Sequence, residues 1–367
     1  MPKSIPHIAI LCSRLDLPGG IERAIVNTAN LFAKKNNPVT LIILDETANS
    51  FYDIYPSIKV IQQNLSFGIT PEGNILSRKI KLLSDVVQLR KLIKKIKADI
   101  LLSSEYPFSV AAVLARPNNK LKIYSWEHHH HAWLQKNKFW AFLCQQAYPK
   151  LNGIICLNQK EAGFYASTAK TFIIPNFVQN EIVKTSSCTH KLILSIGWLI
   201  PRKGIDMMLI AAKNILSKFP GWHWKLIGEG ELQSTVEDFV KNENLEGRFI
   251  LQAPKNESIS DEYANASVFV LSSRFEAFPM VLLEAMQAGL PCVSFDCPSG
   301  PAEIIAQNKD GLLVEKENTV ELSNAIQQLI KNDEQRIRMG ENAAKNIQRF
   351  SADAVYKIWE DNILLHQ

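Results

Sequence analysis

The segment VFVLSSRFEAFPMVLLEAMQAGLPCVSF, residues 268–295, has the pattern of a strand, a loop, a helix and a second strand. Its two apolar runs, Val268–Leu271 and Cys292–Phe295, have the length of buried strands. Between them, Pro279 stands where a first helical residue is favoured, and Gly289 where a helix ends in a glycine cap. Two short apolar strands joined by a helix predict a parallel βαβ unit, covered on both faces of its sheet.

The same alternation extends in both directions from this unit, with amphipathic helical stretches such as Ile21–Lys35 between the apolar runs. Before residue 178 the predicted strands are Ile8–Cys12, Val39–Leu44, Ile58–Ile61, Asp99–Leu102, Lys122–Trp126, Gly153–Leu157 and Phe172–Ile174. After residue 191 they are Leu192–Ile196, Trp224–Ile227, Phe249–Leu251, Val268–Leu271, Cys292–Phe295 and Leu312–Val314. The pattern predicts an α/β protein of two doubly wound, Rossmann-like domains with a cleft between them.

The polar stretch of residues 178–191 shows no sustained period and is the predicted linker. We expect an N-terminal domain over residues 1–180 and a C-terminal domain over residues 191–349. A final helix over residues 350–367 is expected to cross back and pack on the N-terminal domain. Ligands of such sheets bind beyond the carboxyl ends of the strands, so the loops that follow strands are the places to look for a site.

Composition limits the class of protein. The 367 residues are 46% hydrophobic and 21% charged, which suits two globular domains and excludes a disordered or fibrous chain. No run of about 18 apolar residues is present, so no spanning helix is expected. The first apolar run is followed by Arg14 and Asp16, which favours a first strand over a signal peptide. Six scattered cysteines without a CxxC pair indicate free thiols in a reducing cytoplasm.

Charge is distributed unevenly along the chain. The net charge is +5, yet the residues up to Lys184 hold 23 Lys and Arg against 12 Asp and Glu, a net +11. The remainder holds 18 against 24, a net −6. This asymmetry is typical of a protein with one half facing an anionic surface, and equally of two domains that are solvated unevenly.

Two carboxylates of the 268–295 segment are candidate ligand-binding groups. Glu276 lies in the loop before the helix, near its N-terminal N–H groups and the positive end of its dipole, where anions bind. Glu284 stands within an otherwise apolar helix, and burying a carboxylate is costly unless it is hydrogen-bonded. The two O–H donors of a ribose would satisfy it. The alternative is that Glu284 emerges at a solvated edge.

Two further clusters follow strands. Arg202 and Lys203 come after the strand that ends near Gly197 and precede a helix, an arrangement that suits a diphosphate. Gly19 and Gly20 form a turn between the first strand and its helix. The chain contains no GxGxxG and no GxxxxGK[ST], which argues against a nicotinamide-dinucleotide site and against a P-loop.

In order along the chain stand PGGIER (18–23), IPN (174–176), PRKG (201–204), LIGEGE (226–231) and EAFPMVLLE (276–284), with its E-x7-E spacing. This ordered set resembles glycosyltransferase family 4, whose members are retaining, nucleotide-sugar-dependent enzymes of the GT-B fold. The resemblance extends from Gly19 to about Val314. The E-x7-E block is its specific part, whereas PGGIER and IPN alone are common.

The resemblance implies roles for individual residues of the C-terminal domain. Glu284 would bind the donor ribose, and Glu276 would act catalytically beside the donor sugar. The amides of Ala277 and Phe278 would face the sugar or the diphosphate.

The diphosphate has its own set of implied partners. Lys203, helped by Arg202, would hold it, and the Gly19–Gly20 turn would close over it from the other domain. One departure stands at Trp198, where family members commonly carry an arginine that binds the diphosphate.

The run WEHHHH, residues 126–131, follows a predicted strand. Imidazoles are common zinc ligands, but consecutive residues cannot all converge on one ion, and no cysteine pair supports a metal site. The resemblance instead implies that His128, or alternatively His129, acts near the donor sugar. It also implies that no divalent metal or other cofactor is required.

Residues 78–97 concentrate eight cations, namely Arg78, Lys79, Lys81, Arg90, Lys91, Lys94, Lys95 and Lys97. Leucine, valine and isoleucine residues between them supply an apolar face. Such a helix can lie on an anionic membrane, or it can be the solvated outer helix of a domain.

Together these features predict a retaining glycosyltransferase that moves a sugar from a nucleotide diphosphate, most simply UDP, to a glycan or lipid-linked acceptor in cell-surface polysaccharide synthesis. No nucleic-acid partner is expected. The predicted location is the cytoplasm, peripheral on the inner face of the plasma membrane. Two alternatives remain open: a nucleotide-sugar epimerase of the same architecture, and a non-catalytic subunit that binds nucleotide or glycan.

Overall fold

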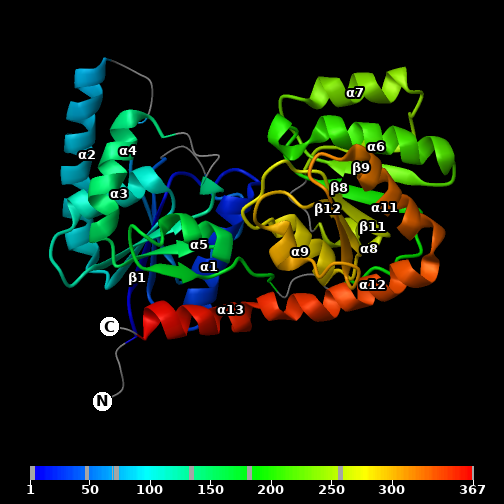
Figure 1. Cartoon of the computed structure of the whole chain (residues 1–367). Coiled ribbons are helices and arrows are strands. Elements are labelled where there is room, and N and C mark those ends of the chain that lie inside the picture. Colours follow the sequence, from blue (N-terminus) through cyan, green and yellow to red (C-terminus); the bar gives the residue numbers. More distant parts are fainter. Residues whose placement is uncertain are drawn as a thin grey trace. The chain divides into compact units, whose positions relative to one another are not determined.

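The computed structural model describes residues 5–45, 49–67, 69, 74–131, 136–179, 184–254 and 259–365. The chain forms two compact units (Figure 1). Unit 1 comprises Met1–Pro175 and Tyr356–Gln367, and unit 2 comprises Asn176–Val355. The division after Pro175 precedes the expected boundary at residue 180, and the chain returns to unit 1 within the expected final helix.

Unit 1 is a seven-stranded parallel sheet with the strand order β3-β2-β1-β4-β5-β6-β7. Its strands are β1 (Ile8–Cys12), β2 (Val39–Ile43), β3 (Lys59–Gln62), β4 (Ile100–Ser103), β5 (Lys122–Glu127), β6 (Gly153–Cys156) and β7 (Thr171–Ile173). Its helices are α1 (Gly20–Lys34), α2 (Ile75–Ile96), α3 (Tyr106–Ala115), α4 (Lys138–Ala147) and α5 (Gln159–Tyr165). The apolar central strands are buried, as expected of a parallel sheet covered by helices.

Unit 2 is a six-stranded parallel sheet with the strand order β10-β9-β8-β11-β12-β13. Its strands are β8 (Leu192–Ile196), β9 (His223–Ile227), β10 (Phe249–Gln252), β11 (Val268–Leu271), β12 (Cys292–Phe295) and β13 (Gly311–Val314). Its helices are α6 (Ile205–Lys218), α7 (Gln233–Asn242), α8 (Ser260–Ala264), α9 (Met280–Gln287), α10 (Pro301–Ile304), α11 (Thr319–Lys331) and α12 (Asp333–Asn346). Helix α13 (Ala352–Trp359) begins in unit 2 and ends in unit 1.

Local sequence signals explain where several helices begin. Five of them start after an asparagine whose side chain accepts a hydrogen bond from a backbone N–H three residues later; these caps are Asn74, Asn137, Asn158, Asn318 and Asn332. Such caps satisfy one of the orphan N–H groups of the first turn.

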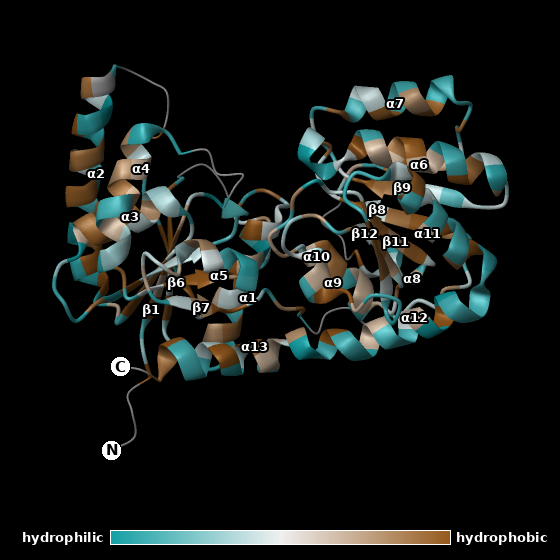
Figure 2. Ribbon diagram, in the orientation of Figure 1, coloured by the Kyte–Doolittle hydropathy of each residue, from teal (hydrophilic) through white to brown (hydrophobic). Residues whose placement is uncertain are grey.

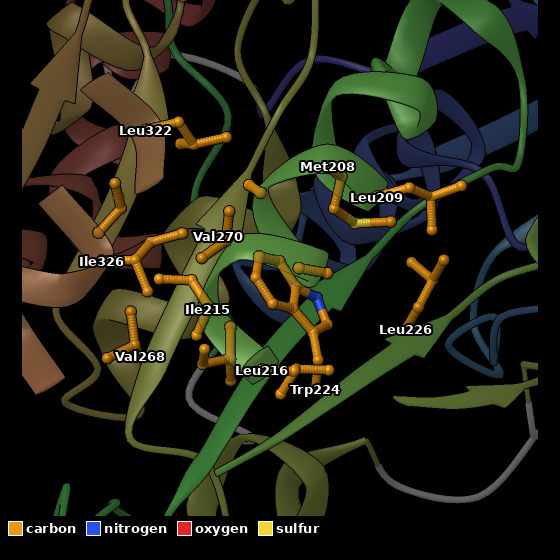
Figure 3. Close-up of a cluster of buried hydrophobic side chains, with 14 of the residues drawn as sticks. Met208, Leu209, Ile215, Leu216, Trp224, Leu226, Val268, Val270, Leu322 and Ile326 are labelled. Atoms are coloured by element: carbon orange, nitrogen blue, oxygen red, sulfur yellow. The ribbon is translucent and has the colours of Figure 1, made fainter. Parts of the chain in front are cut away.

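The core of unit 2 is centred on Trp224 of β9 (Figure 3). This side chain is fully buried, and its indole N–H donates to Ser195 Oγ in β8 at 3.2 Å. Ile215 of α6 and Ile326 of α11 belong to the same cluster, so the sheet and two of its helices share one core.

The C-terminal segment completes the core of unit 1. Trp359, at the end of α13, is 1% exposed. Its ring centroid lies 5.2 Å from that of Phe32 in α1 and 5.4 Å from that of Trp126 in β5, both in edge-to-face geometry. Aromatic pairs of this kind add to the burial of their area. Unit 1 is therefore built from both ends of the chain.

The described part of the expected linker packs into unit 2. The N–H of Ser186 donates to the carbonyl of Ala288 at 2.7 Å, and Cys188 is buried. The guanidinium of Arg336 donates to the carbonyl of Cys188 at 2.8 Å. Hydrogen bonding to backbone groups explains how a polar, aperiodic stretch becomes part of a domain.

All six cysteines are free and buried. Within the described ranges, no helix has the length and apolar character needed to cross a bilayer.

The strand orders locate the places where each sheet can bind a ligand. The order reverses between β1 and β4 in unit 1, and between β8 and β11 in unit 2. In doubly wound sheets, ligands bind at such switch points, outside the carboxyl ends of the strands.

Candidate active site

The switch point of unit 2 brings Lys203 and Glu276 together. Lys203 ends the short 3-10 turn Pro201–Lys203 after β8, and Glu276 lies in the loop after β11. The Lys203 ammonium lies 2.6 Å from Glu276 Oε1, and both side chains are largely buried. The hydroxyl of Ser272 also donates to the carbonyl of Lys203 at 2.9 Å, which fixes one loop against the other.

Gly204 allows this approach. Its φ of +64° lies in the left-handed region, and a Cβ at this position would lie 2.0 Å from the carbonyl oxygen of Ser272. Any other residue would push the two loops apart, so the glycine of the PRKG motif is needed to place Lys203.

Arg274 fastens the same two loops from the outside. Its guanidinium donates to both carboxylate oxygens of Asp206, at 2.8 and 2.6 Å, and to the carbonyl of Pro201 at 2.7 Å. The hydrogen bonds from Arg274 lower the pKa of Asp206. Sequence analysis did not find this residue, because nothing local relates Arg274 to a partner 68 positions away.

Glu276 is held by neighbours in its own loop as well. The hydroxyl of Ser273 donates to Glu276 Oε1 at 2.6 Å, and that of Ser299 donates to the carbonyl of Glu276 at 3.1 Å. The carboxylate thus has a fixed position beside a cation, at the end of β11.

Glu284 is buried inside α9 and is 3% exposed, so the solvated-edge alternative is wrong. The hydroxyl of Tyr263 in α8, which is also fully buried, donates to Glu284 Oε2 at 2.8 Å. Tyr263 is a second residue that sequence analysis missed. A tyrosine in a short helix has no distinguishing signal until the fold brings it beside the carboxylate.

Ala277 and Phe278 are buried at the entrance to α9, for which Pro279 is the N-cap. The carbonyl of Phe278 accepts a hydrogen bond from the side-chain amide of Asn176 at 3.2 Å. Asn176 belongs to the IPN motif, which therefore fastens the loop before α9.

The loop after β8 also carries Arg202, which was predicted to assist Lys203, and Trp198, which stands where family members commonly have an arginine. Arg202 is half-buried within the 3-10 turn, and its carbonyl accepts from the N–H of Arg274 at 2.9 Å. Trp198 is half-buried just after Gly197.

In unit 1, Gly19 and Gly20 lie at the start of α1, after β1. A Cβ at Gly19 would lie 2.0 Å from a carboxylate oxygen of Glu22, so that side chain folds over the glycine turn. Burial raises the pKa of Glu22.

His128 follows β5 and is 7% exposed, with its ring centroid 4.4 Å from that of Trp126. Burial lowers the pKa of His128 to about 3, so the imidazole is neutral at physiological pH. Among the described residues, its Nε2 atom has no hydrogen-bond partner. A neutral imidazole with a spare nitrogen can hydrogen-bond a hydroxyl group of a ligand.

Two of the remaining histidines of the run share one partner, Glu161. His130 Nδ1 pairs with Glu161, and the N–H of His131 donates to the other oxygen of Glu161 at 2.9 Å. His131 stacks on Phe164, and His129 is half-buried. No group of three potential metal ligands occurs in the part of the chain that the structure describes.

A buried polar network supports the strand end that carries His128. Glu127 accepts hydrogen bonds from Ser125 and Tyr148, both at 2.6 Å. Glu105, after β4, has a φ of +116°, an unusual conformation for a residue with a side chain. Burial, and then the charges of Glu127 and Glu22, raise the pKa of Glu105 to about 7.

Residues 18–181 match the family described as Glycosyltransferase Family 4, and residues 179–346 match the family described as Glycosyl transferases group 1. The chain is a family 4-like glycosyltransferase.

Relatives support this assignment over nearly the full length of the glycosyltransferase. An uncharacterized glycosyltransferase of Haemophilus influenzae is 25% identical, over 93% of this chain and 95% of the relative. A Campylobacter jejuni enzyme named as an alpha-1,4-N-acetyl-D-galactosaminyltransferase, with an undecaprenol diphosphate-linked glycan in its name, is 27% identical over 93% of this chain and 94% of the relative.

A solved structure confirms the fold. A mutant form of Staphylococcus aureus TarM, crystallised with fondaparinux, alpha-GlcNAc-glycerol and UDP, aligns with a TM-score of 0.80. It is 17% identical, and the alignment covers 99% of this chain and 100% of that one. The glycosyltransferase therefore has the GT-B architecture of two Rossmann-like domains that its motifs predicted.

Proposed function

We propose that this glycosyltransferase transfers a sugar from a UDP-sugar, with retention of anomeric configuration, to a glycan or lipid-linked acceptor in cell-surface polysaccharide synthesis. The proposal rests chiefly on one observation, the buried Lys203–Glu276 pair at the switch point of unit 2. There a fixed cation and a fixed carboxylate lie side by side where a doubly wound sheet binds its ligand.

The donor is proposed to bind unit 2 through three groups. Glu284, with Tyr263 on one of its oxygens, would accept hydrogen bonds from the ribose hydroxyls. Lys203 would neutralise the diphosphate, assisted by Arg202. In the bound state Lys203 would share its charge between the diphosphate and Glu276, which would lie beside the sugar with the amides of Ala277 and Phe278.

The proposed transfer is a front-face reaction. The bond between C1 of the sugar and the β-phosphate oxygen breaks, and the acceptor oxygen bonds to C1 on the same face. The acceptor's hydroxyl proton passes to the departing phosphate, which leaves as UDP. Lys203 and Arg202 would stabilise the negative charge that grows on that phosphate.

His128 is proposed to hydrogen-bond the transferred sugar. Its burial, neutral state and spare Nε2 suit a hydroxyl group better than a phosphate, which a charged imidazolium would bind. The Gly19–Gly20 turn is proposed to contribute backbone N–H groups at the start of α1.

Two facts about relatives support the choice of substrates. The Campylobacter jejuni relative is named for a lipid-linked glycan, and the TarM structure holds UDP with a GlcNAc-glycerol. The free cysteines suit a reducing compartment, so we place the reaction on the cytoplasmic side of the plasma membrane.

The first experiment is a donor screen that measures UDP release from a panel of UDP-sugars, with and without lipid-linked and soluble glycan acceptors. We expect release that depends on acceptor, with a product of retained configuration by NMR. Activity should persist in excess EDTA, because Lys203, Arg202 and loop amides would supply the charge stabilisation that Mg²⁺ provides elsewhere.

A matched pair of variants controls this screen. Lys203→Gln should lose activity, whereas Lys218→Gln, an exposed lysine at the far end of α6, should not. Conversion of the donor without acceptor would indicate an epimerase. Nucleotide binding without any transfer would indicate a non-catalytic subunit, for which Trp198 would be the first position to examine. Full loss in EDTA, restored by Mg²⁺ or Mn²⁺, would contradict the metal-independent mechanism.

A further inference from the structure

Helix α2 carries two separate apolar faces. The first faces the core of unit 1 and consists of Leu82, Val86, Leu89 and Ile93, all at most 9% exposed. This face accounts for the packing of α2 on its neighbour α3 (Figure 1). A helix that only covers a domain would be polar elsewhere.

The second face is exposed. Leu76, Ile80, Leu83 and Val87 are 67%, 59%, 65% and 52% exposed. Their spacing of four, three and four residues places them on one side of the helix. Figure 2 shows the resulting alternation of hydrophobic and hydrophilic segments along α2. We call these four residues the α2 stripe.

Exposed cations flank the α2 stripe. Lys79 lies within its span, and Arg90, Lys91, Lys94 and Lys95 follow it along the helix. The single acidic residue of the helix, Asp85, is fully buried, where it pairs with Lys81 at 2.9 Å and accepts hydrogen bonds from the N–H groups of Ser66 and Phe67. No acidic side chain of α2 therefore reaches the surface that carries the stripe.

Aromatic side chains of α4 adjoin this surface. The ammonium of Lys79 lies 5.8 Å from the ring centroid of Phe139. Phe139 and Phe142, three residues apart on α4, are 40% and 57% exposed. Apolar side chains of two helices are thus interspersed with positive charge.

We propose that the α2 stripe docks this glycosyltransferase on an anionic lipid bilayer, with its apolar side chains inserted between headgroups and the surrounding cations on the lipid phosphates. Charge complementarity selects this occupant. A second copy of the chain would bring the same cations against each other, whereas an anionic surface neutralises them. The net +11 of the residues up to Lys184 adds a longer-range attraction. The proposal stands independently of the donor site.

The experiment is co-sedimentation of the full chain with vesicles of phosphatidylcholine containing phosphatidylglycerol, and with vesicles of phosphatidylcholine alone, at low and physiological salt. We expect binding to the anionic vesicles, weakened but not abolished by salt, because screening removes charge attraction and leaves apolar insertion. Two variants separate these contributions.

The first variant replaces the stripe, as Leu76→Ser, Ile80→Ser, Leu83→Ser and Val87→Ser. Its partition at physiological salt should fall by at least about tenfold. The second variant replaces cations, as Arg90→Gln, Lys91→Gln, Lys94→Gln and Lys95→Gln. Its partition onto the anionic vesicles should fall by about fivefold for each cation that engages the lipid. The remaining binding should depend little on salt.

Matched controls lie in unit 2. Ile210→Ser with Val320→Ser removes comparably exposed apolar side chains, and Lys218→Gln, Lys241→Gln, Lys309→Gln and Lys331→Gln removes four exposed cations. Both controls should bind vesicles like the native chain, and all variants should retain its circular dichroism and UDP affinity. If the native chain does not bind UDP, that result counts against the proposed function, and the docking result still stands.

Three outcomes would overturn the docking proposal. The native chain could ignore anionic vesicles at low salt. The stripe variant could bind them as tightly as the native chain. Sedimentation velocity could show a native dimer that the stripe substitutions dissociate, which would assign the stripe to a second copy of the chain.

Discussion

The pairing of Glu284 with Tyr263 shows how a single buried carboxylate can be kept ready for a ligand. Burying a carboxyl group inside an apolar helix is costly unless it is hydrogen-bonded, and the hydroxyl of Tyr263 at 2.8 Å offsets part of that cost. The same bond restricts rotation of the carboxylate about the side-chain axis. Tyr263 thus acts as a positioning residue for the group that is proposed to bind ribose.

Tyr263→Phe tests this role at the scale of one oxygen atom. A typical intramolecular hydrogen bond contributes about 0.5–1.5 kcal/mol, and tenfold in affinity corresponds to about 1.4 kcal/mol. We expect the affinity for UDP to fall by about tenfold, while the affinity for 2′,3′-dideoxy-UDP changes little, so that discrimination between the two narrows. Calorimetric titration of both nucleotides measures the two affinities and their ratio.

Tyr165→Phe, a buried tyrosine of unit 1, is the control and should bind both nucleotides like the native chain. Equal losses for both nucleotides in Tyr263→Phe would mean that the hydroxyl only supports the fold.

At the scale of elements, the strands were the most predictable part of the molecule. Every strand expected from an apolar run is present, with ends displaced by a residue or two. The central strands are buried on both faces, which explains their continuous apolar runs, whereas β3 at the sheet edge is largely exposed. The loops that carry Glu276 and Lys203 were also predictable as parts of the site, because both follow strands. The ion pair between the two side chains was not predicted.

Two features of the elements could not be predicted. Leucines and valines in α2 formed one apolar set in the sequence, and only packing against α3 divides them into a buried face and an exposed stripe. Arg274 and Tyr263 were missed because their contacts with Asp206 and Glu284 arise from the tertiary structure. Local patterns carry no information on partners separated by tens of residues.

At the scale of the whole molecule, the chain begins in unit 1 and returns to it. Trp359 fills a place in the core of unit 1 between α1 and β5, while Trp224 is the corresponding large side chain in the core of unit 2. The stability of unit 1 should therefore depend on a segment that follows unit 2 in the sequence.

Trp359→Ala should destabilise unit 1 by about 3–5 kcal/mol, the usual cost of emptying a buried aromatic site. Hydrogen exchange followed by mass spectrometry separates the two units. Peptides of α1 and β5 should exchange faster, and those of α6 and β9 should not. Trp224→Ala is the mirror-image control and should accelerate exchange in unit 2. Faster exchange confined to α13 in Trp359→Ala would contradict a core role.

The central claim is that Lys203, held beside Glu276, binds the diphosphate of a nucleotide donor. The most direct measurement is calorimetric titration of UDP and of uridine into the native chain, Lys203→Gln and Lys218→Gln. Glutamine removes the charge yet can still donate a hydrogen bond to Glu276. We predict that Lys203→Gln weakens UDP binding by about 10- to 100-fold and leaves the affinity for uridine unchanged. The control Lys218→Gln should bind both ligands like the native chain. Equal UDP affinity in the native chain and in Lys203→Gln would contradict the claim.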